Sequence, residues 1–278
     1  MKTRAHSARG FTLVEVIIVM VITGIIGGII AIFIRVPVQN YVDTAGRAEL
    51  SDIADTAVRR MTRELRLAVP NSIRLNATPQ TIEFVPTKTG GRYLASEDGA
   101  PAANPYLSFT STASLAFTVV GAMPTGRQAI IANDNIVVFN EGSGSADVWA
   151  AVGNRAVVQS VLGNVVTLAS NPYAIPNPPI PHPLHRFLVT NGPVRYVCSG
   201  NKLLRFERYP FATAVNATPP TTPAVLASNV SSCTFAYTAS ENNTRSGLVT
   251  LTLVLQRTSA TGPETVTLLQ QVHVDNTP

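Results

Sequence analysis

The pattern of apolar positions divides the chain near its beginning. Residues 11–34, FTLVEVIIVMVITGIIGGIIAIFI, form an apolar run with no Lys, Arg or Asp, and Glu15 is its only ionisable side chain. A helix needs about 20 apolar residues to cross the hydrocarbon core of a bilayer. The run therefore predicts a transmembrane helix over residues 11–34.

A second apolar pattern continues this helix beyond the membrane. Apolar residues recur at steps of three and four, which is typical of a helix with one buried face: Leu50, Ile53, Ala54, Ala57, Val58, Met61, Leu65 and Ala68. Pro70 and the Asn-Ser pair after it are helix-ending residues. We therefore expect one long helix from about residue 11 to residue 68, whose second half packs on a globular domain.

The pattern changes to alternating, β-branched residues after position 72. Strands are predicted at residues 73–76, 81–86, 114–120, 135–140, 147–152, 156–162, 165–169, 186–190, 194–199, 202–208, 232–239, 248–257 and 264–274. Ser199-Gly200-Asn201 predicts a tight hairpin. The expected fold class is α+β, with a long N-terminal helix packed by its second half on a large antiparallel β-rich head. The expected segments are 1–10 as leader, 11–70 as helix, with 11–34 in the membrane, and 71–278 as head. A boundary near Asn171 is an alternative to a single head.

Composition and charge indicate a folded protein and argue against nucleic-acid binding. Of the 278 residues, 45% are hydrophobic and 13% are charged, which argues against disorder. The formal net charge of +5 includes Lys2, Arg4 and Arg9 ahead of the apolar run, and no basic cluster with aromatic residues follows it. Nucleic acid is therefore not expected as a partner. The basic residues before the run predict a cytoplasmic N-terminus and a head outside the cytoplasm.

The chain has two cysteines, Cys198 and Cys233, in separate strand-like segments. An even number without a C-x-x-C spacing suggests one structural disulfide formed in an oxidising compartment. Two unrelated buried thiols are the alternative.

Glu15 needs an explanation, because an ionised carboxylate in a membrane costs about 2.5–3.5 kcal/mol on insertion scales. The run Gly10-Phe11-Thr12-Leu13-Val14-Glu15, preceded by a short basic leader, resembles the signal of type IV prepilins and pseudopilins. The resemblance implies cleavage between Gly10 and Phe11 by a prepilin peptidase and methylation of the new N-terminal Phe11. It also implies that Glu15 pairs with the N-terminal ammonium of a neighbouring subunit. An ordinary membrane anchor that happens to contain a Glu is the alternative.

Three later stretches resemble the minor pilins of the MSHA (mannose-sensitive haemagglutinin) pilus: residues 59–72, residues 191–198 with 204–206, and residues 271–278. The resemblance implies a minor pilin that primes or caps pilus assembly and supports adhesion or motility. Residues 71–278, after the helix, would form a bulky head, which fits a tip complex more easily than every repeat of a shaft. Its partners would be the prepilin peptidase, other major and minor pilins and an inner-membrane assembly platform. It would be a single-pass inner-membrane protein before assembly and lie on the pilus afterwards. A type II secretion pseudopilin and an adhesive module that uses the Pro-rich residues 173–185 or a sheet edge are the alternatives.

The sequence offers little for catalysis or cofactor binding. His182 and His185 have a spacing that metal ligands can adopt, but no Cys or carboxylate follows nearby. Glu97, Asp98, Asp134 and Asp147 are scattered acidic positions that would have to converge to bind calcium. There is no Gly-x-Ser-x-Gly motif and no phosphate-binding loop. We therefore expect a structural subunit with no cofactor, no metal and no enzymatic activity.

Overall fold

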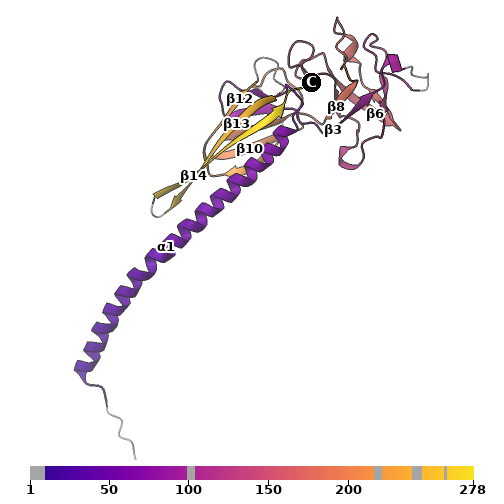
Figure 1. Cartoon of the computed structure of the whole chain (residues 1–278). Coiled ribbons are helices and arrows are strands. Elements are labelled where there is room, and N and C mark those ends of the chain that lie inside the picture. Colours follow the sequence, from indigo (N-terminus) through magenta and orange to yellow (C-terminus); the bar gives the residue numbers. More distant parts are fainter. Residues whose placement is uncertain (1–9, 99–103, 216–220, 240–245, 260–261) are drawn as a thin grey trace, which may run out of the picture. The chain divides into compact units, whose positions relative to one another are not determined.

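A computed structural model of the chain describes residues 10–98, 104–215, 221–239, 246–259 and 262–278 (Figure 1). The chain divides into two compact units. Met1–Glu49 and Thr258–Glu264 form the first, and Leu50–Arg257 and Thr265–Pro278 form the second. Each unit is described by itself below. The long helix α1 (Leu13–Arg66) has its first part in one unit and its last turns in the other, and it continues through Pro37.

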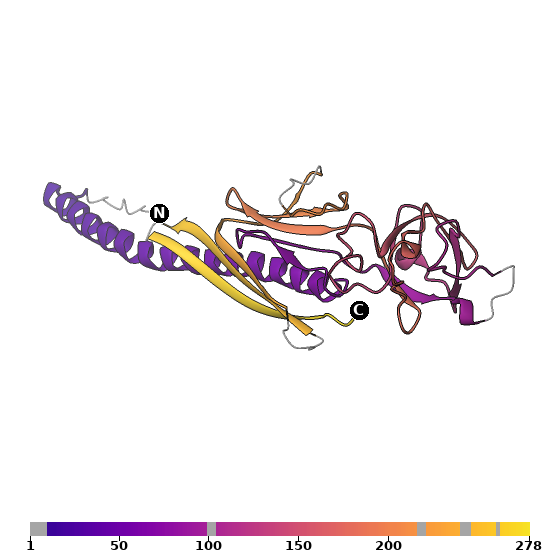
Figure 2. The same cartoon turned by 90° about the horizontal axis from the view of Figure 1, so that it is seen from above.

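The last turns of α1 form the centre of the larger core. Leu50, Ala54, Met61 and Leu65 on α1 are at most 2% exposed and belong to the same hydrophobic cluster as residues of two sheets. Figure 2 shows this part of the helix with one sheet on either side. The predicted stripe at steps of three and four is therefore the buried face, and the expected α+β class is confirmed.

The two sheets are antiparallel. The first has the order β1-β2-β9-β10-β11, with β1 (Arg74–Leu75), β2 (Thr81–Phe84), β9 (Val194–Ser199), β10 (Lys202–Glu207) and β11 (Ala224–Ser228). The second has the order β12-β13-β14, with β12 (Val230–Thr238), β13 (Ser246–Ser259) and β14 (Gly262–Asp275). We call these sheets and the part of α1 between them the pilin-like body.

A closed barrel is inserted into the first sheet. Its strands are β3 (Thr89–Tyr93), β4 (Ala116–Val120), β5 (Asn135–Val137), β6 (Arg155–Leu162), β7 (Val165–Leu168) and β8 (Arg186–Thr190), in the order β3-β4-β7-β6-β5-β8. The whole barrel lies in the chain between β2 and β9, yet these two strands pair directly, with Phe84 opposite Val194. The barrel also has its own core, which includes Phe117 and Phe187 in edge-to-face contact.

A third, smaller hydrophobic cluster joins the barrel to the body. It contains Val69, Val85, Val137, Val148 and Trp149. The Trp149 indole N–H donates to the carbonyl oxygen of Ser72 at 2.9 Å, and the Arg74 guanidinium lies 3.5 Å from the centre of the Trp149 rings. Such a cation–π contact adds about 0.5–2 kcal/mol. The junction is therefore a packed interface within the second unit.

Most predicted strands are confirmed to within a few residues, and Ser199-Gly200-Asn201 is the predicted hairpin. Gly200 and Asn201 both have positive φ, at 57° and 60°, as a two-residue type I′ turn requires. The strand predicted at residues 147–152 is wrong. The N–H of Trp149 donates to the side chain of Asp147, and the N–H of Ala150 donates to the carbonyl oxygen of Asp147. These turn contacts replace strand pairing there.

Two strands were not predicted. β3 contains Gly90 and Gly91, which are disfavoured in strands, but a Cβ at Gly91 would lie 2.8 Å from the Phe187 ring. The glycine is therefore required because the Phe187 ring packs against the β3 backbone. β11 follows a Thr- and Pro-rich stretch and forms because β10 offers it a pairing edge.

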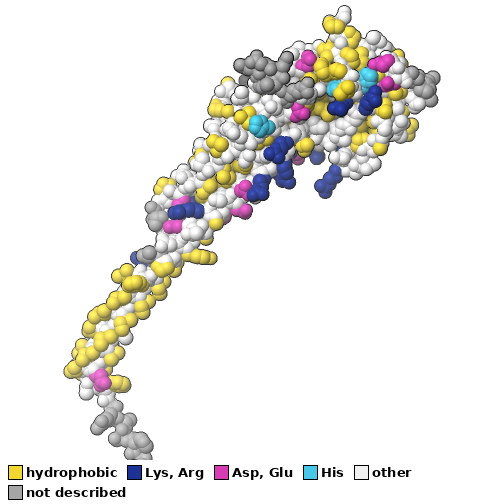
Figure 3. Space-filling model, viewed as in Figure 1, with side chains coloured by type: hydrophobic (Ala, Val, Ile, Leu, Met, Phe, Trp, Pro, Cys, Tyr) yellow, Lys and Arg dark blue, Asp and Glu magenta, His cyan; other side chains and the backbone are white. Residues whose placement is uncertain are grey.

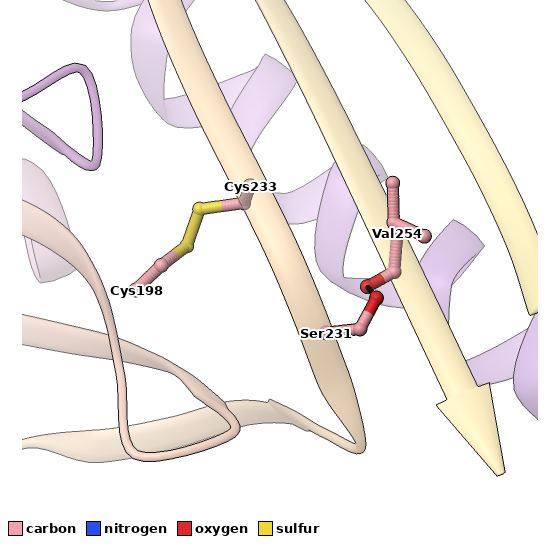
Figure 4. The surroundings of a disulfide bond; sticks show 4 residues. All are labelled: Cys198, Ser231, Cys233 and Val254. Carbon is pink, nitrogen blue, oxygen red and sulfur yellow. Dashed lines mark hydrogen bonds between the residues drawn. A yellow bond between two sulfur atoms is a disulfide. The ribbon is translucent and has the colours of Figure 1, made fainter.

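The structure joins Cys198 on β9 and Cys233 on β12 by a disulfide, with 6.2 Å between the two Cα atoms (Figure 4). The bond links the two sheets of the pilin-like body. For a sequence separation of 35 residues, the chain-entropy account gives a stabilisation of roughly 3–4 kcal/mol. Reduction is therefore expected to loosen the two sheets from each other.

Candidate functional site

The residues at the predicted cleavage bond lie ahead of the helix and are accessible. Phe11 is 80% exposed, and apart from chain neighbours no described residue lies within 4 Å of the Cβ position of Gly10. Gly10, Phe11 and Thr12 are outside the helix, which begins at Leu13. The bond between Gly10 and Phe11 thus lies in exposed chain just before the helix. The rest of the leader, residues 1–9, lies outside the described residues.

Thr12 determines where the helix begins. Its Oγ1 accepts a hydrogen bond from the N–H of Glu15 at 3.3 Å, and its carbonyl oxygen accepts the first helical bond from Val16 at 3.2 Å. This is an N-cap, and the Thr-x-x-Glu spacing is that of a capping box. Sequence reasoning treated Thr12 only as part of the motif, although its spacing from Glu15 was a usable signal. The cap places Glu15 on the first helical turn, where the helix dipole stabilises a negative charge.

The Glu15 side chain lies on the first turn of α1 among apolar neighbours. Among the described residues it has no hydrogen bond and no ion pair of its own. Its neighbours along α1 are apolar, with Leu13 78% and Val14 63% exposed. In a lipid environment, such a carboxylate needs a cation to offset its desolvation. The chain described here does not supply that cation at Glu15.

The first half of α1 presents apolar side chains around its whole circumference. Every large hydrophobic residue from Phe11 to Ile34 is at least 43% exposed, and hydrophobic side chains cover this part of the helix in Figure 3. The Thr23 hydroxyl donates to the carbonyl oxygen of Val19 at 2.6 Å, so it is satisfied within the helix. Within the described chain, α1 is long and apolar enough to cross a membrane.

Three glycines interrupt this apolar surface. A Cβ at Gly24, Gly27 or Gly28 would meet no described atom within 4 Å. Small residues on a membrane helix allow another helix to approach closely. Within the described chain these three positions are therefore uncovered.

The candidate metal ligands have other contacts. His182 Nδ1 accepts the N–H of Leu184 at 2.9 Å, whereas His185 Nε2 lies 2.8 Å from Glu97. An Asp98 carboxylate oxygen lies 3.8 Å from His185 Nδ1. Asp134 pairs instead with the Lys88 ammonium at 2.7 Å, and the Asp147 carboxylate accepts the N–H of Trp149. The acidic positions therefore do not converge. Over the described ranges, no group of three or more His, Cys, Asp or Glu residues is arranged to hold a metal.

The comparison with known families adds one finding. Residues 6–31 match the family model of the prokaryotic N-terminal methylation motif, a range that contains Gly10, Phe11, Thr12 and Glu15. Neither a curated protein nor a solved structure matches the chain. The motif, the exposed apolar helix and the antiparallel head together support a type IV pilin-like prepilin, a membrane-anchored subunit of the pilin and pseudopilin class.

Proposed function

We propose that this chain is a minor pilin of a type IV pilus, a structural subunit that primes or caps assembly. The observation that carries the proposal is the start of α1, where an accessible Gly10–Phe11 bond precedes a capped apolar helix whose Glu15 lacks a partner within the described chain. After cleavage, the new ammonium of Phe11 on one subunit would pair with Glu15 of the next. Each group is costly alone in lipid, and the pair offsets both costs.

The inserted barrel supports a position at the pilus tip. It lies between two adjacent strands of the body and adds a second core to each subunit. A subunit with such an addition is easier to place at the end of a filament than in every repeat of a tightly packed shaft. We therefore propose sparse incorporation in a tip complex, with the prepilin peptidase, other pilins and an inner-membrane assembly platform as partners. Shaft-like abundance along the filament would contradict the tip position.

The MSHA pilus is the proposed system. Residues 59–72, 191–198 with 204–206, and 271–278 resemble the MSHA biogenesis minor pilin MshO. They lie at the end of α1, in β9 and β10, and at the end of β14, so all three belong to the pilin-like body. A type II secretion pseudopilin would share the same body. Recovery of the chain with purified surface pili, and not with a secretion system, distinguishes the two.

The mature N-terminus tests the class directly. Mass spectrometry of the protein from the membrane fraction is expected to give a chain that begins with methylated Phe11. The Gly10→Val variant is expected to keep its leader completely, because a branched side chain replaces the residue at the scissile bond. If the Gly10→Val protein loses its leader at the same place, or the parent protein keeps it, the prepilin proposal is wrong.

Glu15 is expected to act after processing. Glu15→Ala should leave cleavage at Gly10 intact and reduce incorporation into pili at least about tenfold, since it removes the partner of a buried ammonium. The measurement compares the leader-free protein in membranes with the amount in sheared pili. Glu49→Ala, on the same helix beyond the apolar run, is the matched control and should incorporate normally. If Glu15→Ala and Glu49→Ala enter pili in equal amounts, the proposed pairing of Glu15 with a neighbouring subunit is wrong.

A further inference from the structure

A pocket lies where the end of α1, the barrel and the C-terminal segment meet. Its volume is about 290 Å³, and its apolar lining comes from Leu67, Ala68, Val137, Phe139 and Leu188. Leu67 is 57% exposed, so apolar surface is available there. Ligand pockets in proteins begin at about 300 Å³. At about 290 Å³ the pocket lies just below this range, so any ligand that it holds is small.

Two arginines and one aspartate line the pocket, together with Pro278. Arg66, the last residue of α1, and Arg186, the first residue of β8, both line it. Neither guanidinium forms an ion pair with any residue that the structure describes. Asp275 also lines the pocket, where it accepts the N–H of Thr277 at 2.9 Å. The exposed guanidinium groups of Arg66 and Arg186 are thus available to an anion that enters the pocket.

His182 contributes a neutral ring to the same pocket. Its Nδ1 accepts the N–H of Leu184 at 2.9 Å, so Nε2 carries the proton and donates to the main-chain oxygen of Pro278 at 3.2 Å. Burial lowers the pKa of His182, and Arg186 lowers it further. The ring is therefore a polar, uncharged part of the wall, and the positive charge comes from the two arginines.

One wall of the pocket is strained. Phe139 has a φ of 50°, a conformation that is unfavourable for a bulky residue. It is maintained by a hydrogen bond from the Asn154 amide to its carbonyl oxygen at 3.3 Å and by edge-on contact of its ring with His182 at 5.7 Å. Such conformations cost roughly 1–3 kcal/mol and concentrate at ligand sites. The two contacts hold the Phe139 ring in the wall of the pocket.

We propose that this pocket binds a small organic acid, with the carboxylate at Arg66 and Arg186 and an apolar body against Leu67, Phe139 and Leu188. Guanidinium groups suit a carboxylate because their N–H donors match its two oxygens. The apolar lining selects against small inorganic anions, which have nothing to bury there. The proposal is independent of the pilin role, because all the residues lie in the second unit, whereas the start of α1 belongs to the first.

The test measures binding of 4-phenylbutyrate to the full chain in phosphatidylcholine nanodiscs by ligand-observed NMR, with empty nanodiscs subtracted. Saturable binding of 4-phenylbutyrate is expected, and the uncharged 4-phenylbutanamide should bind at least about tenfold more weakly, because charge-assisted hydrogen bonds are lost. The Arg66→Gln/Arg186→Gln double variant should bind 4-phenylbutyrate at least about tenfold more weakly than the parent chain, for the same reason. Arg127→Gln changes an exposed guanidinium elsewhere on the second unit and should leave the affinity unchanged.

Several results would overturn the proposal. Equal affinity for 4-phenylbutyrate and 4-phenylbutanamide would show that the negative charge does not contribute to binding. Unchanged binding by the double variant would show that the ligand does not contact Arg66 and Arg186. Failure of 4-phenylbutyrate to saturate at millimolar concentration would also count against it. If the double variant binds the acid normally but no longer enters pili, the two arginines contact another subunit and the pocket is not a small-molecule site.

Discussion

Excision of the barrel is expected to leave a folded, processed and assembly-competent subunit. The expectation rests on the direct pairing of β2 with β9. Phe84 precedes the insertion in the chain and Val194 follows it, yet the two residues lie opposite each other in the sheet. Replacing residues 88–191 with an Asn-Gly dipeptide keeps Val85 and Thr87. The N–H of Val69 donates to the carbonyl oxygen of Val85, and the N–H of Thr87 donates to that of Leu67, both at 2.7 Å. These two bonds hold the segment that follows α1. A short loop then closes a sheet that is already in register.

The excised chain should be somewhat less stable, because Val69 and Val85 lose their contacts with Trp149 and Val148. It should still lose its leader, form the Cys198–Cys233 disulfide and be recovered with pili within about threefold of the parent level. Leu253→Asp is the matched control, since Leu253 is fully buried in the body and a carboxylate there should abolish folding.

The measurements are the mature mass, alkylation of free thiols and the amount in sheared pili. Degradation of the excised chain to the level of Leu253→Asp would show that the body depends on the barrel. Normal incorporation with loss of adhesion would favour the adhesive alternative and place adhesion on the barrel.

Glu83→Ala is expected to be among the most destabilising single substitutions in the head. The Glu83 side chain is fully buried on β2, and its oxygens lie 2.6 Å from Arg74 and 2.7 Å from Arg195. Tyr209 donates its hydroxyl to the same carboxylate, and burial raises the pKa of Tyr209 so that it remains a donor. Removing the carboxylate leaves two guanidiniums facing each other without their shared counter-charge. Breaking a buried pair in this way costs about 3–5 kcal/mol.

Thermal unfolding of the full chain in nanodiscs checks this expectation, with a fall in the midpoint of roughly 10 °C for the second unit. The matched control is Asp55→Ala, which breaks the ion pair with Arg59, a pair of 2.6 Å whose side chains are 75% and 49% exposed. Exposed pairs contribute about 0.2–1 kcal/mol, so the control should shift the midpoint little. If Glu83→Ala shifts it no more than Asp55→Ala, the network around Glu83 does not stabilise the head.

The sequence alone determined the features that depend on local pattern. The apolar run that predicts a membrane helix, the buried stripe from Leu50 to Leu65 and the prepilin-like junction at Gly10 and Phe11 each involve residues within a few helical turns. Local spacing fixes which residues share a helix face, and lipid thickness fixes the length of the run. The Ser199-Gly200-Asn201 hairpin belongs here too, because a two-residue turn requires particular residues.

Only the tertiary structure decided how the head is built. Alternation of apolar residues identifies strands but does not say which strands pair, so the adjacency of β2 and β9 across the barrel was not predictable. The strand at Gly91 needs a glycine because the Phe187 ring, distant in sequence, packs against it, and Trp149 lies in a turn whose contacts with Asp147 replace strand pairing. Arg66, Arg186, His182 and Phe139 line one pocket from segments far apart in the chain, which periodicity cannot reveal.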